Sequence, residues 1–299
     1  MKSKATAARI KKLEIQGARR LAKAGLEALA FDAKRSRAKT LPAFKKEVLA
    51  NSRMLATARP TEPALRNGLA VVQKALAIES TLPEAKIAVN EACTQYVKGM
   101  EAAKKRIVEV GVKRILKGMT VLTHCHSSTV TAILVAAWKK GKRFGVINTE
   151  TRPRFQGRLT ATELAKAGIP VTHIVDSAAR RVMNDVDLVL VGADAITAEG
   201  NLVNKIGTSQ IALVAHEART DFGVACETYK FDPLTMMGEY EPIEYRSTRE
   251  VWAKPPRRVK IRNPAFDFTP PEYIDYIITE EGIITPFEAA HILRERAKW

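Results

Sequence analysis

The 299-residue sequence has few cysteines, few aromatic residues and no long hydrophobic run. Its three cysteines, at positions 93, 125 and 226, form no Cys-X-X-Cys pair, so we expect reduced thiols and a cytoplasmic protein. The longest uncharged apolar stretch, residues 129–138, is far shorter than the ~20 residues that cross a bilayer. The charged first ten residues lack the apolar core of a signal peptide, so no membrane partner is expected.

The usual signatures of nucleotide and metal sites are also missing. Neither the Gly-X-Gly-X-X-Gly fingerprint nor the phosphate-binding loop that ends in Gly-Lys-Ser/Thr occurs in the chain. His124, Cys125 and His126 are consecutive, and three consecutive residues cannot easily aim three ligands at one metal ion. The sequence therefore predicts neither a cofactor nor a metal site.

Positive charge is concentrated in the first part of the chain. Residues 1–119 contain 26 Lys and Arg against 10 Asp and Glu, whereas residues 120–299 contain 23 against 22. A basic region attracts phosphates, either on nucleic acid or on small metabolites, and it can also be a solvated, lysine-rich helical surface. The basic part has only three aromatic residues (Phe31, Phe44 and Tyr96), which argues against a platform for stacking nucleic-acid bases.

The spacing of apolar residues divides the chain into two parts. Residues 1–118 show helical spacing, and we predict helices near residues 10–21, 43–55, 65–77 and 84–116. After Gly118 the pattern changes to short apolar strands that alternate with helices, which indicates a mostly parallel sheet covered on both faces. The predicted strands are residues 119–124, 145–148, 171–175, 188–191, 223–226 and 276–279, and helices are expected at 128–140, 159–167 and 177–183. The predicted fold is α/β, with a basic helical N-terminal domain (1–118) and a Rossmann-like catalytic domain (119–299).

Polar residues gather where the predicted strands end. Clusters at residues 124–128, 148–152, 176–177 and 192–194 follow four of these strands, and another lies at residues 204–208. Ligands of open parallel sheets bind at the carboxyl ends of the strands. We therefore expect these clusters to form one site.

Two residues in these clusters have suitable chemistry for proton transfer. Cys125 precedes a predicted helix, whose N–H groups and dipole would lower the pKa of the thiol. The alternative is that Cys125 is a small buried residue with no chemical role. Asp194 follows the end of an apolar strand, where desolvation favours a protonated carboxyl group that can donate a proton. The alternative is that Asp194 caps a helix.

Several neighbours offer contacts for phosphate. The hydroxyl groups of Ser127, Ser128 and Thr129 lie at the start of the same predicted helix. Lys205 and Lys230 are isolated cations that either hold a phosphate or lie at the surface.

Together these segments resemble the family that contains archaeal ribose-1,5-bisphosphate isomerase, methylthioribose-1-phosphate isomerase and the regulatory subunits of translation initiation factor 2B. The match covers most of residues 120–285 and thins upstream to Gly17-Ala18 and Arg59-Pro60-Thr61. Its segments are THCHS (123–127), TETRP (149–153), DSAA (176–179), VGAD (191–194), NKIGT (204–208), ETYKF (227–231), NPAFD (263–267) and TPPE (269–272).

The resemblance implies an enzyme that converts ribose 1,5-bisphosphate to ribulose 1,5-bisphosphate in the salvage of nucleotides such as AMP. It implies Cys125 and Asp194 as the catalytic pair, no cofactor, and a homo-oligomer (dimer or hexamer). The implied substrate contacts are Gly17, Ala18, Arg19, Arg59, Ser127, Ser128, Thr129, Asn204, Lys205 and Lys230.

The sequence departs from the isomerases at one position. Their first helix carries an Arg-Gly-Ala segment that helps to hold phosphate, whereas Gln16-Gly17-Ala18-Arg19 stands here, so Arg19 would have to supply the missing charge. Three alternatives stay open: a non-catalytic regulatory subunit that binds initiation factor 2, a methylthioribose-1-phosphate isomerase, and a nucleic-acid-binding protein. The presence of both Cys125 and Asp194 favours an enzyme.

Overall fold

The first part of the chain is helical, as predicted. The computed structural model describes residues 1–297, and its first five helices are α1 (Lys2–Lys11), α2 (Ala18–Lys34), α3 (Leu41–Ala56), α4 (Pro63–Ile78) and α5 (Leu82–Arg114). Proline lies in the first turn of α3, α4 and α5, where its missing N–H group costs nothing. Thr40 and Thr81 cap α3 and α5 through their side chains.

The single helix predicted near residues 10–21 is wrong. The chain leaves the helix after Lys11 and enters α2 only at Ala18, although the apolar spacing continues through this segment. Leu13 and Gly17 have positive φ angles of 58° and 85°, a conformation that no right-handed helix contains. Apolar periodicity alone does not reveal such a turn.

The second part forms a mostly parallel sheet, and all six predicted strands are confirmed. The sheet order is β10-β9-β7-β4-β1-β2-β3, and only β10 is antiparallel to its neighbour. The strands are β1 (Thr120–Thr123), β2 (Gly145–Thr149), β3 (Val171–Ile174), β4 (Leu188–Gly192), β7 (Asp221–Ala225), β9 (Tyr276–Thr279) and β10 (Gly282–Ile284). Strand β10 was not predicted, nor was a small antiparallel sheet made of β5 (Ala195–Ile196), β6 (Leu202–Lys205) and β8 (Phe266–Thr269).

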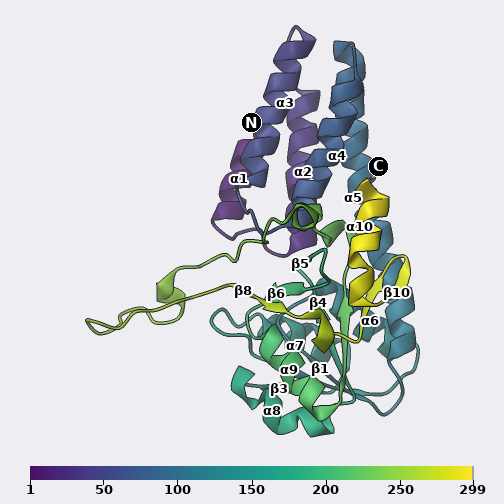
Figure 1. The fold of residues 1–299 in the computed structure, drawn as a ribbon, viewed down its shortest axis with the longest axis vertical. Helices are drawn as coiled ribbons and strands as arrows, with labels where there is room; N and C mark the ends of the chain where they lie inside the picture. The colour runs from purple at the N-terminus through teal and green to yellow at the C-terminus, as the bar shows by residue number, and fades with distance from the viewer. Residues whose placement is uncertain (298–299) are drawn as a thin grey trace.

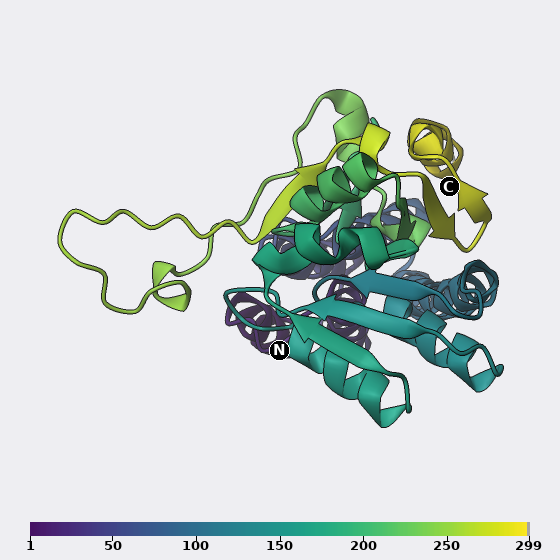
Figure 2. The same cartoon turned by 90° about the horizontal axis from the view of Figure 1, so that it is seen from below.

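Helices cover both faces of the large sheet (Figures 1 and 2). Along β4, Leu188 and Leu190 pack with the end of α5, α6 (Ser128–Lys139) and α7 (Gly157–Lys166). Val189 and Val191 pack on the other face with α8 (Ala179–Val182), α9 (Thr208–Ala218) and α10 (Ala289–Ala297). This alternation confirms an α/β fold with a parallel sheet between two helical layers. The helix predicted at residues 177–183 is only the short α8, flanked by two 3-10 turns.

Helix α5 contributes to two hydrophobic cores. Met100 packs among the N-terminal helices, whereas Ile107 and Val112, farther along the same 33-residue helix, pack against the sheet. The helical part is thereby anchored on the sheet through one continuous element. The domain boundary at residues 118/119 stays a prediction.

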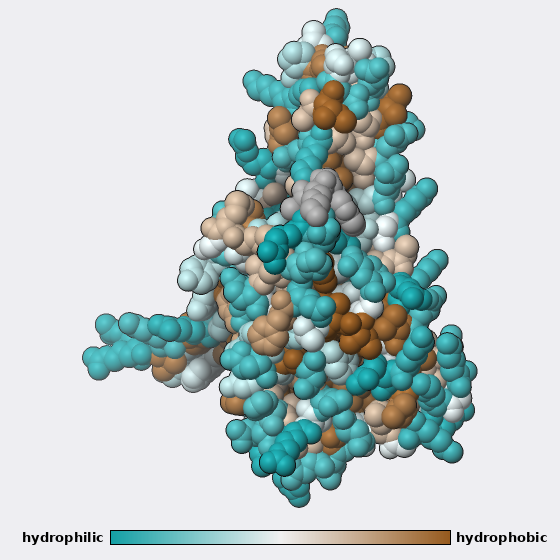
Figure 3. All heavy atoms as spheres, turned by 45° about the vertical axis from the view of Figure 1, so that its right-hand side comes forward, coloured by the Kyte–Doolittle hydropathy of each residue, from teal (hydrophilic) through white to brown (hydrophobic). Residues whose placement is uncertain are grey.

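Residues 247–262, which we call the arm, extend far from the body (Figures 1 and 2). A β-bridge between Tyr245 and Pro264 and a hydrogen bond from the Arg246 N–H to the Asn263 carbonyl (2.9 Å) close its base. The arm has six Lys or Arg residues and one Glu, and its surface is mostly hydrophilic in the view of Figure 3. Across the described residues 1–297, no helix combines the length and the apolar character needed to cross a membrane.

Candidate active site

The strand order places the two predicted catalytic residues at neighbouring strand ends. Strands β1 and β4 are parallel partners, with Val121 opposite Leu188. Cys125 lies two residues beyond the end of β1, and Asp194 lies two residues beyond the end of β4. The side chains are also within electrostatic reach, because the Asp194 carboxylate helps to raise the pKa of the Cys125 thiol.

Neighbouring loops hold the backbone of Cys125 in a strained conformation. Its φ angle is +63°, which costs a non-glycine residue of order 1–3 kcal/mol. Its N–H donates to Thr151 Oγ1 (2.9 Å), and its carbonyl accepts from Thr160 Oγ1 (2.8 Å). The Thr151 N–H in turn donates to Asp176 Oδ1 (2.8 Å), after β3. The loops after β1, β2 and β3 therefore meet, as the polar clusters suggested.

The predicted low pKa of Cys125 is wrong. Burial raises its pKa to about 11, although the Lys205 ammonium, the His126 N–H and the Arg246 guanidinium act in the opposite direction. Helix α6 begins only at Ser128, so its dipole acts from a distance, while the loss of bulk water acts on the sulfur directly. At pH 7 the thiol therefore dominates, with roughly one molecule in 10⁴ carrying a thiolate.

Three cations from distant segments converge on the Cys125–Asp194 edge. Lys205 at the end of β6 interacts electrostatically with Cys125 and Asp194, and also with Arg59 and Arg246. Its ammonium donates to the Ala265 carbonyl (2.9 Å) and lies 4.7 Å from the Phe266 ring centroid. Burial lowers the pKa of Lys205, and the neighbouring arginines add to this effect. Such mutual repulsion favours an anion at this place.

Arg59 and Arg246 both form ion pairs with carboxylates. Arg59, between α3 and α4, pairs with Glu62 (3.1 Å) and Glu244 (3.2 Å), and its guanidinium carbon lies 5.6 Å from the Phe266 ring centroid. Arg246, at the base of the arm, pairs with Glu244 at 3.3 Å. Glu244 thus joins the helical part of the chain to the base of the arm beside the sheet.

Some of the predicted substrate contacts are engaged inside the protein. Lys230 donates to the Ala193 carbonyl (2.9 Å) and pairs with Glu227 (2.9 Å), whose other oxygen accepts from Thr129 Oγ1 (3.1 Å). Burial opposes the charge of Glu227, but Lys230, the Glu227 N–H and Thr129 together outweigh it and lower the pKa of the carboxyl group. Asn204 donates to Thr208 Oγ1 at 3.0 Å. Through these internal contacts the side chains stabilise the loops around Cys125 and Asp194.

The serines stand at the start of α6. Ser127 Oγ accepts from the Val130 N–H (3.4 Å) and caps the helix, while Ser128 is its first residue and is partly exposed. Ser127 also packs closely on β4, because a Cβ atom at Gly192 would lie 2.6 Å from Ser127 Oγ. This glycine therefore allows the start of α6 to approach the strand that carries Asp194.

The start of α2 lies near the same edge, but Arg19 is already paired. Its guanidinium contacts Glu101 at 2.7 Å, and Lys23 contacts the other oxygen of that carboxylate at 3.3 Å. Gln16 donates to the Leu13 carbonyl (2.9 Å), Gly17 is exposed with φ +85°, and Ala18 is buried. Among the described residues, no hydrogen bond or ion pair joins this segment to Cys125.

Two cations that the sequence analysis did not single out act electrostatically on His126, the residue after Cys125. Burial lowers the pKa of His126, and Arg20 and Lys104 lower it further, while Glu163 opposes them. Arg20 of α2 and Lys104 of α5 therefore lie close enough to His126 to act on its charge. Neither residue lies in one of the polar clusters at the strand ends, so no local signal in the sequence marks them.

His124 is neutral and structural. Its Nε2 contacts the Ile206 carbonyl (2.9 Å), which can only accept, so Nε2 carries the proton and Nδ1 accepts from Thr149 Oγ1 (2.5 Å). Burial lowers the pKa of His124 to about 4, against the opposing charge of Asp176. Among the described residues, no group of three or more His, Cys, Asp or Glu side chains could hold a metal ion.

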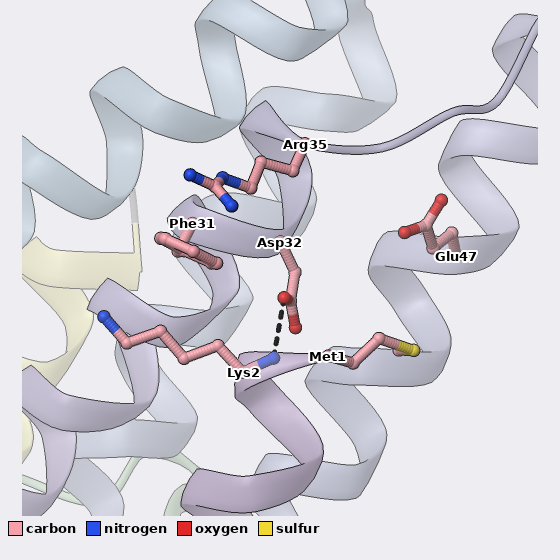
Figure 4. Close-up of a pocket in the computed structure, with 6 residues that line it drawn as sticks. All are labelled: Met1, Lys2, Phe31, Asp32, Arg35 and Glu47. Carbon is pink, nitrogen blue, oxygen red and sulfur yellow. Dashed lines mark hydrogen bonds between the residues drawn. The ribbon is translucent and has the colours of Figure 1, made fainter.

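A separate cavity of about 290 Å³ lies between helices of the N-terminal part, where Asp32 faces the start of α1 (Figure 4). Asp32 accepts from the N–H groups of Lys2 (2.8 Å) and Ser3 (2.7 Å). Burial opposes the charge of Asp32, but these donors outweigh it and lower its pKa. At 1.5 Å per helical residue, Asp32 lies roughly 20 Å along α2 from Ala18. This cavity is therefore distinct from the candidate active site.

Comparisons with known proteins agree with this architecture. The chain is 45% identical to the ribose 1,5-bisphosphate isomerase of Pyrococcus furiosus, over 98% of this chain and 93% of that protein. It is 46% identical to the enzyme of the same name from Archaeoglobus fulgidus, over 97% and 92%. The crystal structure of translation initiation factor eIF-2B from Pyrococcus horikoshii superposes with a TM-score of 0.83 at 32% identity, covering 94% of this chain and 96% of that one.

A more distant relative carries the name of one of the alternatives. The methylthioribose-1-phosphate isomerase of Pelotomaculum thermopropionicum is 37% identical over 93% of this chain and 81% of that protein. The model of the initiation factor 2 subunit family matches residues 14–286. The chain therefore belongs to the initiation factor 2 subunit family.

Proposed function

We propose that this chain is an isomerase that converts ribose 1,5-bisphosphate to ribulose 1,5-bisphosphate, as a step in nucleotide salvage in the cytoplasm. The observation that carries the proposal is the placement of Cys125 and Asp194 at neighbouring strand ends beside three converging cations. Relatives of that name at 45–46% identity over nearly the whole chain support it. The three cysteines are all free thiols, which fits a reducing compartment.

The cations match a substrate with two phosphates. Lys205, Arg59 and Arg246 provide one basic region beside Cys125, while Arg20 and Lys104 provide another beside His126. Two such regions suit a sugar with phosphate at both ends. The proposed binding residues, in direct contact or through the loops that they hold, are Gly17, Ala18, Arg19, Arg59, Ser127, Ser128, Thr129, Asn204, Lys205 and Lys230.

The chemistry must open a sugar ring whose anomeric oxygen carries a phosphate. In the proposed reaction the Cys125 thiolate removes the proton from C2, and the electrons of that bond form a C1–C2 double bond. The bond from C1 to the ring oxygen breaks, and the carboxylic-acid form of Asp194 donates its proton to that oxygen. Cys125 then returns a proton to C1 while Asp194 takes the proton of the C2 hydroxyl, which leaves a ketone at C2. Both residues end in their starting forms, and each positioned proton transfer contributes about 10²–10⁴-fold.

The same two residues argue against a non-catalytic regulatory subunit, which needs no paired acid and base. The proposal also favours the bisphosphate over methylthioribose 1-phosphate. The monophosphate needs an apolar slot for its methylthio group, whereas the edge around Cys125 is lined by cations and carboxylates.

We further propose that the protein is a homo-oligomer, a dimer or a hexamer, and that the arm takes part in its contacts. The arm exposes Trp252 (49%) and Val259 (44%) among its cations. An irregular excursion of this length with exposed apolar side chains usually has a binding role.

Turnover of ribose 1,5-bisphosphate by the purified protein tests the proposal. Proton NMR in deuterated water should show ribulose 1,5-bisphosphate with deuterium at C1, because the proton returned to that carbon exchanges with solvent through Cys125. Methylthioribose 1-phosphate is the matched comparison and should react at least 100-fold more slowly. Absence of turnover, or preference for the monophosphate, contradicts the proposal.

A further inference from the structure

Glu62 is a buried acid that the proposed reaction does not use. It is the residue before α4, and its side chain is completely inaccessible to solvent. Its carboxylate does not cap that helix; instead, Oε1 lies 3.1 Å from an Nη1 of Arg59. Apart from this ion pair, neither carboxylate oxygen accepts a hydrogen bond from any residue between 1 and 297, the part of the chain that the structure describes. A buried carboxylate with so few donors is poorly compensated for the loss of water.

The charges that face Glu62 come from four segments. Arg59 approaches from its own loop, Asp194 from the β4–β5 loop, Lys230 from the 3-10 turn Thr228–Lys230, and Glu244 from the base of the arm. Lys230 is already paired with Glu227 (2.9 Å), and Glu244 itself contacts Arg59 (3.2 Å). Glu62 therefore depends on Arg59 for its counter-charge, and it shares this guanidinium with Glu244.

Because of this arrangement, Glu62 gains or loses its proton near neutral pH. Burial raises the pKa of Glu62 to about 7, because the attraction of Arg59 only partly offsets the loss of water and the repulsion of Asp194. A new negative charge at Arg59 would compete for the same guanidinium and raise that pKa further.

We propose that Glu62 is a proton-linked counter-ion of Arg59, ionised in the free protein at mildly alkaline pH and protonated when a substrate phosphate binds to that arginine. The inference rests on the proposed function, which places a phosphate at Arg59. One proton from the solvent converts the Glu62 carboxylate to a carboxylic acid, and the phosphate dianion replaces it as the counter-charge of the guanidinium. No covalent bond of the substrate changes in this step. Glu62 is thus a positioning residue that makes substrate binding depend on pH.

Proton uptake at Glu62 makes the affinity for the substrate depend on pH. Above pH 7 the free protein must take up a proton to bind, so its affinity falls about tenfold for each further pH unit. Glu62→Gln imitates the protonated side chain and is expected to bind about tenfold more tightly than its parent at pH 8. At pH 6 the two should bind alike.

The test measures proton uptake directly. Ribulose 1,5-bisphosphate is titrated calorimetrically into the Cys125→Ser protein, which cannot turn it over, at pH 8 in buffers of different ionisation enthalpy. The phosphates of the sugar are fully ionised at this pH, since their second pKa is about 6, so they take up no proton themselves. We expect nearly one proton per bound bisphosphate, and nearly none in Cys125→Ser/Glu62→Gln.

Glu109→Gln in the same background is the matched control, because Glu109 forms an ion pair with Arg106 at the same spacing and the same 3.1 Å, but on an exposed helix surface. It should leave proton uptake unchanged. Uptake near zero in the Cys125→Ser protein, or undiminished uptake in the double variant, overturns the inference. Should the double variant fail to fold, an affinity of Cys125→Ser that does not fall above pH 7 overturns it equally. Wild-type turnover without proton uptake would contradict only this inference, whereas uptake without turnover of ribose 1,5-bisphosphate would contradict only the proposed function.

Discussion

Lys230 donates a hydrogen bond to the carbonyl oxygen of Ala193 at 2.9 Å, and so fixes the residue immediately before Asp194. The same ammonium group pairs with the buried Glu227. Burial opposes the charge of Lys230, but Glu227 together with Cys226 and Asp194 outweighs it and raises the pKa of the lysine. The loop that carries Asp194 is therefore tied to a buried ion pair and does not depend on surface contacts.

Lys230→Met should weaken both folding and catalysis. The substitution leaves Glu227 buried without its cation, which is expected to lower the free energy of unfolding by about 3 kcal/mol or more. The freed Ala193 carbonyl should also loosen Asp194 and lower kcat at least tenfold. Urea unfolding and turnover measure the two effects, with Lys23→Met, in a partly exposed pair, as the control. A variant with normal stability and kcat would show that this ion pair does not support the site.

Activity should rise with pH if Cys125 acts as the base. Because burial raises its pKa to about 11, the thiolate fraction grows tenfold per pH unit between pH 7 and pH 10, and kcat should follow until another step limits it. Cys125→Ser should fold normally and lose at least 100-fold in kcat. Iodoacetamide labelling followed by peptide mass spectrometry gives an independent measure: labelling of Cys125 should be slow at pH 7 and accelerate with pH. A kcat that is independent of pH between 7 and 9 would contradict the assignment.

Local features of the fold and the site can be predicted from the sequence, whereas features that depend on tertiary packing cannot. The six strands and the polar residues at their ends are local features, and the sequence was sufficient to predict them. That Cys125 and Asp194 are neighbours depends on β4 pairing with β1, which is a long-range fact. The pKa of Cys125 was predicted in the wrong direction because desolvation comes from tertiary packing. Arg246 was missed for a related reason: it lies beside the Tyr245–Pro264 bridge at the base of an irregular segment, and this long-range pairing has no local signal in the sequence.

His124 should make the protein sensitive to acid. Its pKa is about 4 in the folded state against an ordinary value of 6.5, so the folded state disfavours the proton. The contribution of neutral His124 to the free energy of unfolding is fully present above pH 6.5. It is lost as the pH falls towards 4, by roughly 3 kcal/mol in total. His124→Gln should lower stability at pH 7 and remove this part of the pH dependence in urea unfolding. The exposed His291→Gln should behave like wild type, and an unchanged pH profile in His124→Gln would contradict the prediction.

Asp32 should matter for stability and not for activity. Asp32→Ala removes the acceptor for the N–H groups of Lys2 and Ser3 at the start of α1, which should cost about 1–3 kcal/mol. Its distance from the active site predicts an unchanged kcat and KM at temperatures where the variant is folded. Asp185→Ala, in an exposed turn, is the control and should stay within about 0.5 kcal/mol of wild type. A large loss of kcat in Asp32→Ala would mean that the N-terminal cavity communicates with the site.

Shortening the arm tests its proposed role in assembly. Residues 250–259 can be replaced by a short Gly-Ser linker, which keeps the Tyr245–Pro264 bridge and Arg246 in place. If the arm contacts another copy of the chain, light scattering should show a smaller assembly at the same protein concentration. The matched control is Trp252→Ser/Val259→Ser, which keeps the length and the charge of the arm and should weaken assembly only if its apolar side chains form the contact. An unchanged mass with unchanged kcat in the shortened protein would exclude the arm from both assembly and catalysis, and would direct the search for its partner to other molecules.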